Sequence, residues 1–271
     1  MKPQIKNRLS WILLVAVSAL WLGGCASEPS RGFSAHVDAP GLARGSIEGR
    51  HFLHAVFWKN PHPNAARLHV YLDGDGTPWV DGRHVATDPT PRNPLALDLM
   101  ARDPWPAVYL GRPCYHGSFA DTGCVPYLWT HGRYSPQVVD SMAEALRRVI
   151  RRAGASEVVL IGYSGGAALG RLLAPRIPEA VALVTVAGLH DTTAWARHHG
   201  YLELEGSLNP ARQPPLAAEV RQTHFVGGRD TNLPTSLIPS ELAGTVVVLP
   251  GFDHVCCWVE NWAKLIGDLG I

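Results

Sequence analysis

The feature that most constrains the fold of this chain is a serine set between glycines where an apolar run gives way to a helical one. Residues Gly162 to Gly166 read Gly-Tyr-Ser-Gly-Gly, after the β-rich run Glu157 to Ile161 and before a helical run from Ala167. A strand that turns sharply into a helix brings the two elements close together, and glycine tolerates that approach. The pattern predicts that the Ser164 hydroxyl projects from the turn. It also predicts that the Gly165 N–H is unpaired at the start of the helix.

A serine at such a turn needs a base and an orienting carboxylate to act as a nucleophile. Gln222 to Val226 reads as a strand, and Asp230 lies in the loop after it. Thr245 to Leu249 reads as the next strand, and His254 follows that one. In an open parallel sheet, residues after the carboxyl ends of the strands gather at one edge. The chain order Ser, Asp, His therefore predicts that Ser164, Asp230 and His254 converge.

Over essentially the whole chain after its N-terminal segment, the sequence resembles the α/β-hydrolase superfamily, which includes serine esterases and lipases. The resemblance implies that Ser164 is the nucleophile, that His254 acts as general base and then acid, and that Asp230 orients the histidine. It implies the α/β-hydrolase fold, with a mainly parallel central sheet, helices on both faces and a short cap insertion after the sixth strand. The motifs that carry it are Gly162-Tyr-Ser-Gly-Gly166, Gly228-Arg-Asp230 and Phe252-Asp-His254.

Other residues of the same types compete for these roles. His190 and Asp191 follow an apolar run, but Asp191 is favoured as the N-cap of a helix from Thr192. Asp253 adjoins His254, and neighbours on an extended loop point in different directions. We therefore prefer Asp230 as the orienting carboxylate.

A second backbone N–H for an oxyanion is expected in the loop after an earlier strand. Arg67 to Leu72 reads as that strand, and Asp73-Gly-Asp-Gly76 follows. Lipases and esterases carry a His-Gly-Gly-Gly-like segment there, and here aspartate replaces the histidine while the glycines are kept. We assign the second N–H to Gly74 or Asp75, beside that of Gly165. The segment lacks the later acidic ligands of a calcium loop, so we expect no metal ion.

The first 24 residues have the parts of a secretory signal. Three basic residues precede the apolar run Trp11 to Leu22, which is too short for a permanent transmembrane helix. Leu22-Gly-Gly-Cys25 resembles the bacterial lipobox, which implies cleavage before Cys25 and lipid attachment to it. Ala26, in place of a retention-type Asp, then favours outer-membrane sorting where a cell has two membranes. We expect a lipid-anchored protein of the bacterial cell envelope that faces the periplasm or exterior. An ordinary signal peptide cleaved elsewhere is the alternative.

Without that segment the charge balance changes. Its three basic residues leave 24 − 3 = 21 Lys and Arg against 23 Asp and Glu, a net charge of −2, which gives no indication of nucleic-acid binding. Apart from Cys25 there are four cysteines, an even number that suits an oxidising compartment. Pairing of Cys114 with Cys124 and of Cys256 with Cys257 is one possibility, and links between these two loops are another. Their spacing does not suit a zinc site.

The remaining chain divides into two parts. Residues 25–48 show no apolar period and scattered Ser, Pro and Gly, so we expect a flexible tether. Alternating strands and helices then predict one α/β-hydrolase domain over residues 49–271. The expected strands are His51–Trp58, Arg67–Leu72, Ala107–Leu110, Glu157–Ile161, Val181–Ala187, Gln222–Val226 and Thr245–Leu249, and the expected helices include Leu95–Ala101, Ser135–Ala153, Gly165–Pro175, Thr192–His198, Pro234–Leu242 and Cys257–Leu269.

Two long loops rich in aromatic residues, Gly111 to Tyr134 and Leu189 to Leu216, should leave the sheet at its active edge. Loops of this length in a compact domain are usually functional. The second stands where hydrolases of the resembled superfamily insert a cap. Local packing of both loops onto the body is the alternative.

Together these features predict a lipid-anchored serine hydrolase that cleaves small-molecule carboxylic esters through an acyl-enzyme intermediate, with no cofactor. A peptidase or thioesterase that uses the same three residues is one alternative. Another is a non-catalytic hydrolase-fold protein that binds envelope partners. For the two loop residues taken singly, the alternatives are that Asp230 caps a helix near Pro234 and that His254 is a solvated loop residue. The sequence gives no indication of the oligomeric state.

Overall fold

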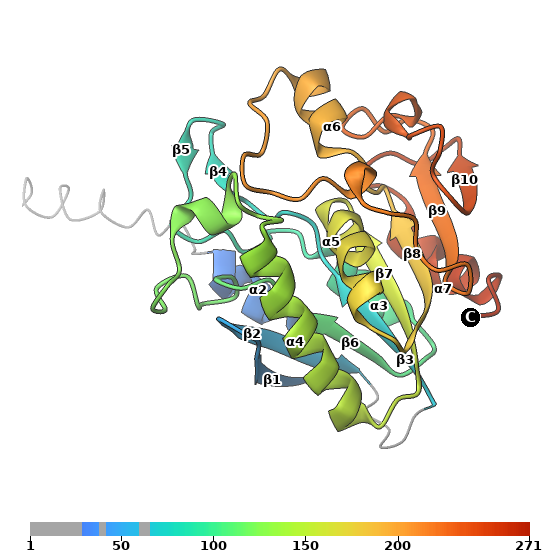
Figure 1. Cartoon of the computed structure of the whole chain (residues 1–271), viewed down its shortest axis with the longest axis horizontal. Helices are drawn as coiled ribbons and strands as arrows, with labels where there is room; N and C mark the ends of the chain where they lie inside the picture. The colour runs from blue at the N-terminus through green and yellow to red at the C-terminus, as the bar shows by residue number, and fades with distance from the viewer. Residues whose placement is uncertain (1–28, 38–41, 60–65) are drawn as a thin grey trace, which may run out of the picture.

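The short apolar runs of the sequence become the strands of one sheet in the computed structural model, which describes residues 29–37, 42–59 and 66–271. Eight strands lie in the order β1-β2-β6-β3-β7-β8-β9-β10 (Figure 1). β2 runs against its two neighbours, and the other strands share one direction. The strands are β1 (Leu42–Glu48), β2 (Leu53–Lys59), β3 (Arg67–Leu72), β6 (Ala107–Leu110), β7 (Glu157–Tyr163), β8 (Ala180–Val186), β9 (Arg221–Gly227) and β10 (Thr245–Leu249), with a separate hairpin of β4 (Trp79–Val80) and β5 (His84–Val85).

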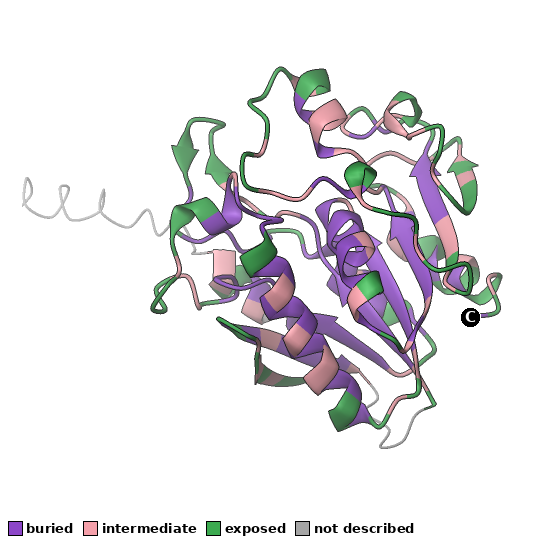
Figure 2. Ribbon diagram, viewed as in Figure 1, coloured by how far each residue is buried: buried purple, intermediate pink, exposed green. Residues whose placement is uncertain are grey.

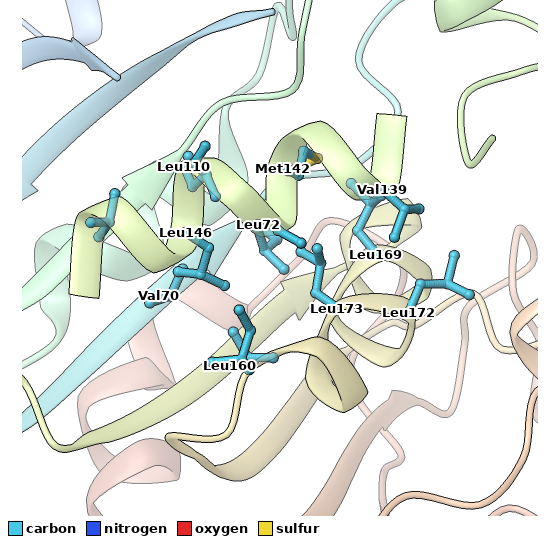
Figure 3. Packing of buried hydrophobic residues seen from close by; sticks show 14 of the residues in the cluster. Val70, Leu72, Leu110, Val139, Met142, Leu146, Leu160, Leu169, Leu172 and Leu173 are labelled. Atoms are coloured by element: carbon cyan, nitrogen blue, oxygen red, sulfur yellow. The ribbon is translucent and has the colours of Figure 1, made fainter. Parts of the chain in front are cut away.

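Helices cover both faces of this sheet, and its central strands are therefore buried on both sides (Figure 2). α4 and α5 pack on one face, where Leu146 and Leu169 belong to the same buried cluster as Leu160 of the sheet (Figure 3). α2, α3 and α7 pack on the other face, around Trp258 and Trp262. No helix in the described ranges is long and apolar enough to cross a membrane. The helices are α2 (Pro29–Val37), α3 (Leu95–Arg102), α4 (Pro136–Ala153), α5 (Gly165–Leu173), α6 (Thr192–His199) and α7 (Trp258–Gly267).

The expected fold class, a mainly parallel sheet with helices on both faces, is confirmed. Helix α4 shows how local sequence sets the ends of an element: Ser135 caps its first turn by accepting from the Val138 N–H, and Gly154 ends it with φ 64°. The segment expected as a cap, residues 189–216, follows β8, which is the sixth strand of the sheet in chain order. It contains α6.

The structure corrects the expected tether. The signal segment, Cys25 and residues 26–28 lie outside the described residues, but the rest of residues 25–48 is folded wherever it is described. β1 pairs with β2 along its whole length, and Phe33 of α2 is buried against Phe57 and Tyr109. β1 is an edge strand held by backbone bonds, so most of its side chains are exposed and it shows no apolar period.

A second correction concerns the helix expected over Pro234–Leu242. The structure has only a short 3₁₀ turn, Thr235–Leu237. Pro239 explains the difference, because the residue before a proline is disfavoured in the helical region. Ile238 accordingly has φ −74° and ψ 122°, which are extended values.

Candidate active site

The turn at Ser164 has the backbone that its sequence predicts. Ser164 lies between β7 and α5 with φ 51°, a value that non-glycine residues rarely adopt. A Cβ on Gly162 would lie 2.4 Å from the carbonyl oxygen of Gly166, and one on Gly166 would lie 2.0 Å from that of Leu72. Both glycines are therefore required by the close approach of strand and helix. The Ser164 N–H donates to the carbonyl of Val186 at 2.9 Å, which ties the turn to β8.

The side chains of Ser164, His254 and Asp230 form a hydrogen-bonded chain. Nε2 of His254 lies 3.1 Å from Oγ of Ser164, and Nδ1 lies 2.8 Å from Oδ2 of Asp230. The two loop residues come from the carboxyl ends of β10 and β9, as their places in the sequence predict. The structure thus brings together all three residues predicted to cooperate.

Asp230 is held in a charged and fixed state. It is 4% exposed, and its other oxygen accepts from the N–H groups of Asn232 and Leu233 at 2.8 and 2.9 Å. Burial raises the pKa of Asp230, but the bond to His254 and these two N–H groups outweigh burial and keep the pKa below its usual range. A charged carboxylate accepts the Nδ1 proton of His254, which leaves Nε2 free to take a proton from Ser164.

Asn232 also belongs to this cluster, although no motif in the sequence indicates it. Its Nδ2 lies 3.0 Å from Nε2 of His254. The amide N–H therefore donates to the ring nitrogen that faces Ser164, holding the imidazole and competing with the hydroxyl. The only signal in the sequence was its place two residues after Asp230, and asparagine is common in loops for other reasons.

The rival residues have other partners. Asp191 accepts from two N–H groups in the first turn of α6, as expected of an N-cap. His190 is buried, with its ring 4.8 Å from that of His224. Asp253 accepts from the N–H groups of the two residues after His254. Each is engaged in local structure and not with the Ser164 hydroxyl.

The loop after β3 lies against the serine. A Cβ on Gly74 would lie 3.4 Å from Cβ of Ser164. The Gly74 N–H, however, donates to Oδ1 of Asp73 at 2.8 Å. The Asp75 N–H has no acceptor among residues 29–37, 42–59 and 66–271, and the Gly165 N–H lies in the first turn of α5, where helices offer none. Of the two expected alternatives for the second oxyanion donor, the geometry favours Asp75.

The Asp75 side chain is fixed by a cluster of polar and charged groups that no sequence pattern indicates. It accepts from Nη2 of Arg112 at 2.8 Å, from Nη1 of Arg133 at 2.7 Å, and from the Tyr134 hydroxyl. The two arginine side chains are 4% and 5% exposed. Burial raises the pKa of Asp75, but the charges of Arg133 and Arg112 outweigh burial and keep the pKa below its usual range. The carboxylate fills the place of a Gly165 Cβ, which would lie 2.0 Å from Oδ1.

The two carboxylates of Asp73-Gly-Asp-Gly76 therefore have different partners. Asp73 is bonded to the Gly74 N–H and the Tyr109 hydroxyl, and burial raises its pKa to about 6. Within the described residues, no three His, Cys, Asp or Glu side chains are grouped so as to hold a metal ion.

No protein-family model matches the chain, and no curated protein matches it in sequence. Solved structures do resemble it. The esterase Pf2001 of Pyrococcus furiosus aligns with a TM-score of 0.56 at 12% identity, over 84% of this chain and 90% of that one. XC6422 of Xanthomonas campestris, an α/β serine hydrolase without a lid, aligns with a TM-score of 0.52 at 15% identity, over 85% and 92%. The chain has the α/β-hydrolase fold.

A third structure with this α/β-hydrolase fold is a bacterial membrane phospholipase A, described as a virulence factor. It aligns with a TM-score of 0.52 at 15% identity, over 97% of this chain and 96% of that one. Identities this low concern the fold alone. The chemistry open to the site therefore depends on its own geometry.

In this hydrolase fold, Ser164 and His254 open into a cavity of about 770 Å³. Its walls combine the loop after β3 with apolar and aromatic side chains, and both long loops expected at this edge contribute. Walls that combine apolar surface with a few polar and charged groups, here including Arg92 and Arg133, are typical of small-molecule sites. The lining residues outside the triad and the loop after β3 include Thr130, His131, Arg133, Leu189, Trp195, Tyr201, Leu202, Leu204, Leu233 and Val255.

The cysteines pair within each loop. Cys114 is joined to Cys124, with Cα atoms 5.5 Å apart, and Cys256 to Cys257, with Cα atoms 3.7 Å apart. Of the possible connectivities, the structure therefore has the one with no link between the two loops. The second pair lies directly after the His254 loop, at the start of α7.

Proposed function

We propose that this chain is a serine hydrolase that cleaves carboxylic esters through an acyl-enzyme intermediate. The observation that carries the proposal is the hydrogen-bonded chain from Ser164 through His254 to Asp230, at the wall of a largely apolar cavity. A strained serine, a correctly oriented imidazole and a buried carboxylate together meet the geometric requirements for nucleophilic catalysis.

In the first half of the reaction, Oγ of Ser164 attacks the ester carbonyl carbon while Nε2 of His254 takes the hydroxyl proton. Asp230 stabilises the imidazolium that forms. The carbonyl oxygen becomes an anion, which the N–H groups of Gly165 and Asp75 bind. When this intermediate collapses, the carbon–oxygen bond to the alcohol breaks, and the alcohol leaves with the proton from His254.

In the second half, water attacks the acyl group on Ser164 while His254 takes one of its protons. The new tetrahedral intermediate is bound by the same N–H groups. Its collapse releases the carboxylic acid and returns the proton to Oγ of Ser164. A single oxyanion donor contributes about 10²- to 10³-fold to kcat in serine hydrolases, so the fixed directions of the Gly165 and Asp75 N–H groups add to the effect of the triad.

A fluorophosphonate probe tests the nucleophile directly. We expect it to label the wild type and the Ser46→Ala control, in which an exposed serine on edge strand β1 is changed, but not Ser164→Ala. Labelling that persists in Ser164→Ala would sink the assignment. Hydrolysis of p-nitrophenyl esters of graded chain length, beside aminoacyl amides and thioesters, then separates an esterase from the peptidase and thioesterase alternatives.

We further propose that the protein works at the bacterial cell envelope, attached through a lipid on Cys25. Support comes from the sequence, since the basic, apolar and Leu22-Gly-Gly-Cys25 segments lie outside the described residues. Metabolic labelling with an alkyne fatty acid should mark the wild type and not Cys25→Ser. Equal labelling of both would contradict the anchor. Membrane fractionation then tests the expected outer-membrane location.

A further inference from the structure

Large apolar side chains are exposed around the mouth of the cavity. In the hairpin of β4 and β5, Trp79, Val80 and Val85 are 36, 45 and 40% exposed. After α6, Tyr201 and Leu202 are 58 and 79% exposed. These five residues, with Val255 of the His254 loop, are here called the apolar rim.

Four of the six rim residues come from distant segments and meet at the same opening, and Val80 and Val85 adjoin Trp79 within the hairpin. Trp79, Tyr201, Leu202 and Val255 all line the cavity that contains Ser164. The hairpin and the end of α6 lie on the same side of the molecule, beyond the carboxyl ends of the strands (Figures 1 and 2). Single exposed apolar residues are ordinary, but a group of them around an opening marks an interaction surface.

The chain enters the folded domain beside this rim. α2 begins at Pro29, and the N–H of Ser30 donates to Oδ2 of Asp88 at 2.7 Å. The Ser30 hydroxyl donates to the same oxygen. Asp88 lies three residues after the last residue of β5, Val85. The start of the described chain is therefore fixed at the base of the hairpin.

Because the described residues from Pro29 onward are folded, few residues separate Cys25 from the domain. Cys25 stands four positions before Pro29, in place of the long linker expected from the sequence. A chain spans at most about 3.6 Å per residue, so a lipid on Cys25 lies within about 14 Å of the start of α2. A lipid-anchored domain is then held close to the bilayer by the side that carries the hairpin.

We propose that the apolar rim docks on the phospholipid bilayer that holds the Cys25 lipid, so that the cavity opens toward the membrane and receives ester-linked acyl chains of its lipids. The proposal deepens the proposed ester hydrolysis and rests on it. Trp and Tyr side chains, here Trp79 and Tyr201, are enriched at the headgroup level of bilayers. Leu202 and Val80 add apolar area that can enter the acyl region. The mature net charge of −2 offers no general attraction to anionic lipid, so apolar burial drives the contact.

The first test does not depend on catalysis. The full lipidated chain, carrying Ser164→Ala to protect the lipid, is placed in phosphatidylcholine vesicles with or without bromine on the acyl chains. Trp79→Phe is compared with Trp105→Phe. Trp105 is a matched control because it is 43% exposed but lies just before β6, at the amino ends of the strands and so away from the rim. We expect bromine to quench tryptophan emission, and Trp79→Phe but not Trp105→Phe to remove most of that quenching. Equal quenching in Trp79→Phe and the parent would overturn the proposal.

The second test uses the active full chain in the same vesicles without bromine. Val80→Asp and Val85→Asp are combined, since neither residue lines the cavity. We expect hydrolysis of vesicle phospholipid to fall about tenfold, because carboxylates resist entry into the bilayer, while hydrolysis of a soluble short-chain ester is unchanged. Val246→Asp, at a 38% exposed position of β10, should change neither rate.

The outcomes separate the two proposals. An unchanged vesicle rate in the double variant overturns docking. A wild type that hydrolyses neither substrate contradicts the proposed function, and the quenching experiment then still decides whether the rim docks. Loss of the soluble-ester activity in the double variant indicates misfolding, in which case the quenching experiment alone decides.

Discussion

Replacing Asp75 by asparagine removes a negative charge from between two buried guanidinium groups. Arg112 and Arg133 donate to the carboxylate at 2.8 and 2.7 Å, and the Tyr134 hydroxyl donates as well. An amide offers one acceptor oxygen and one donor nitrogen. Whichever way the new amide is turned, its NH₂ group faces a donor, and at least one arginine loses its partner.

Asp75→Asn should therefore lower the free energy of unfolding. Removing one partner from a buried ion pair costs about 3–5 kcal/mol, because the remaining charge has neither water nor a counter-ion. A domain of this size loses about 2–4 °C in Tm per kcal/mol, so Asp75→Asn should melt about 6–20 °C below the wild type. Asp81→Asn is the control, since Asp81 pairs with His84 where the two side chains are 60% and 77% exposed. Such a pair contributes at most about 1 kcal/mol, so its Tm should fall by less than about 4 °C.

The pH dependence of this difference has a definite sign. The pKa of Asp75 is lower in the folded than in the unfolded chain, because Arg133 and Arg112 outweigh the effect of burial. Its stabilising contribution is therefore complete above the unfolded pKa of about 3.9 and is lost as the pH falls through the folded pKa. Calorimetry should show a constant difference between Asp75→Asn and wild type from about pH 7 to pH 5, and a smaller one below about pH 4. A variant that melts with the wild type at neutral pH would refute the reasoning.

Three further outcomes follow from the site and the core. Asp230→Asn should lower kcat for a soluble ester by about 10³- to 10⁴-fold, since an amide favours the wrong tautomer of the histidine, and a loss of less than about tenfold would contradict its orienting role. Gly165→Ala should lower both the activity and the Tm, because the new Cβ would lie 2.0 Å from Oδ1 of Asp75. Normal hydrolysis by this variant would contradict the close packing of Gly165 against the Asp75 carboxylate. Burial lowers the pKa of His54 to about 4 and that of His190 to about 3. As the pH falls below about 6.5, these histidines take up protons in the unfolded chain but stay neutral in the folded one, so Tm should fall from about pH 6.5 toward pH 4. A Tm that stays constant over that range would contradict neutral buried histidines.

The triad could be predicted because its geometry is a consequence of chain order. Asp230 and His254 each follow a strand, and parallel neighbours bring the residues after their carboxyl ends to one edge. The turn at Ser164 could be predicted too, since Gly162 and Gly166 are required by contacts within the strand–turn–helix unit and with the adjacent strand. In both cases short-range pattern and topology are sufficient.

The residues that support the site could not be predicted in this way. Arg112 and Tyr134 stand at the ends of a long loop without periodicity, so nothing in the sequence indicates that they meet Asp75. Edge strand β1 was missed for a related reason: backbone pairing with β2, which any sequence can make, holds it in place. Both failures concern long-range contacts that leave no local pattern.

These supporting contacts explain how backbone donors can be kept in a fixed direction. An oxyanion site is effective only when its N–H groups need no reorganisation as charge develops. Here the Asp75 carboxylate fills the space beside Gly165 and is held by two arginines of one loop, and Arg133 also lines the cavity. These contacts therefore join the cavity wall and the proposed oxyanion donors into one unit. His254 belongs to a separate loop that is joined to this unit through its bond to Ser164. A substitution in the arginine cluster should accordingly change kcat through the oxyanion while leaving the bond between His254 and Asp230 in place.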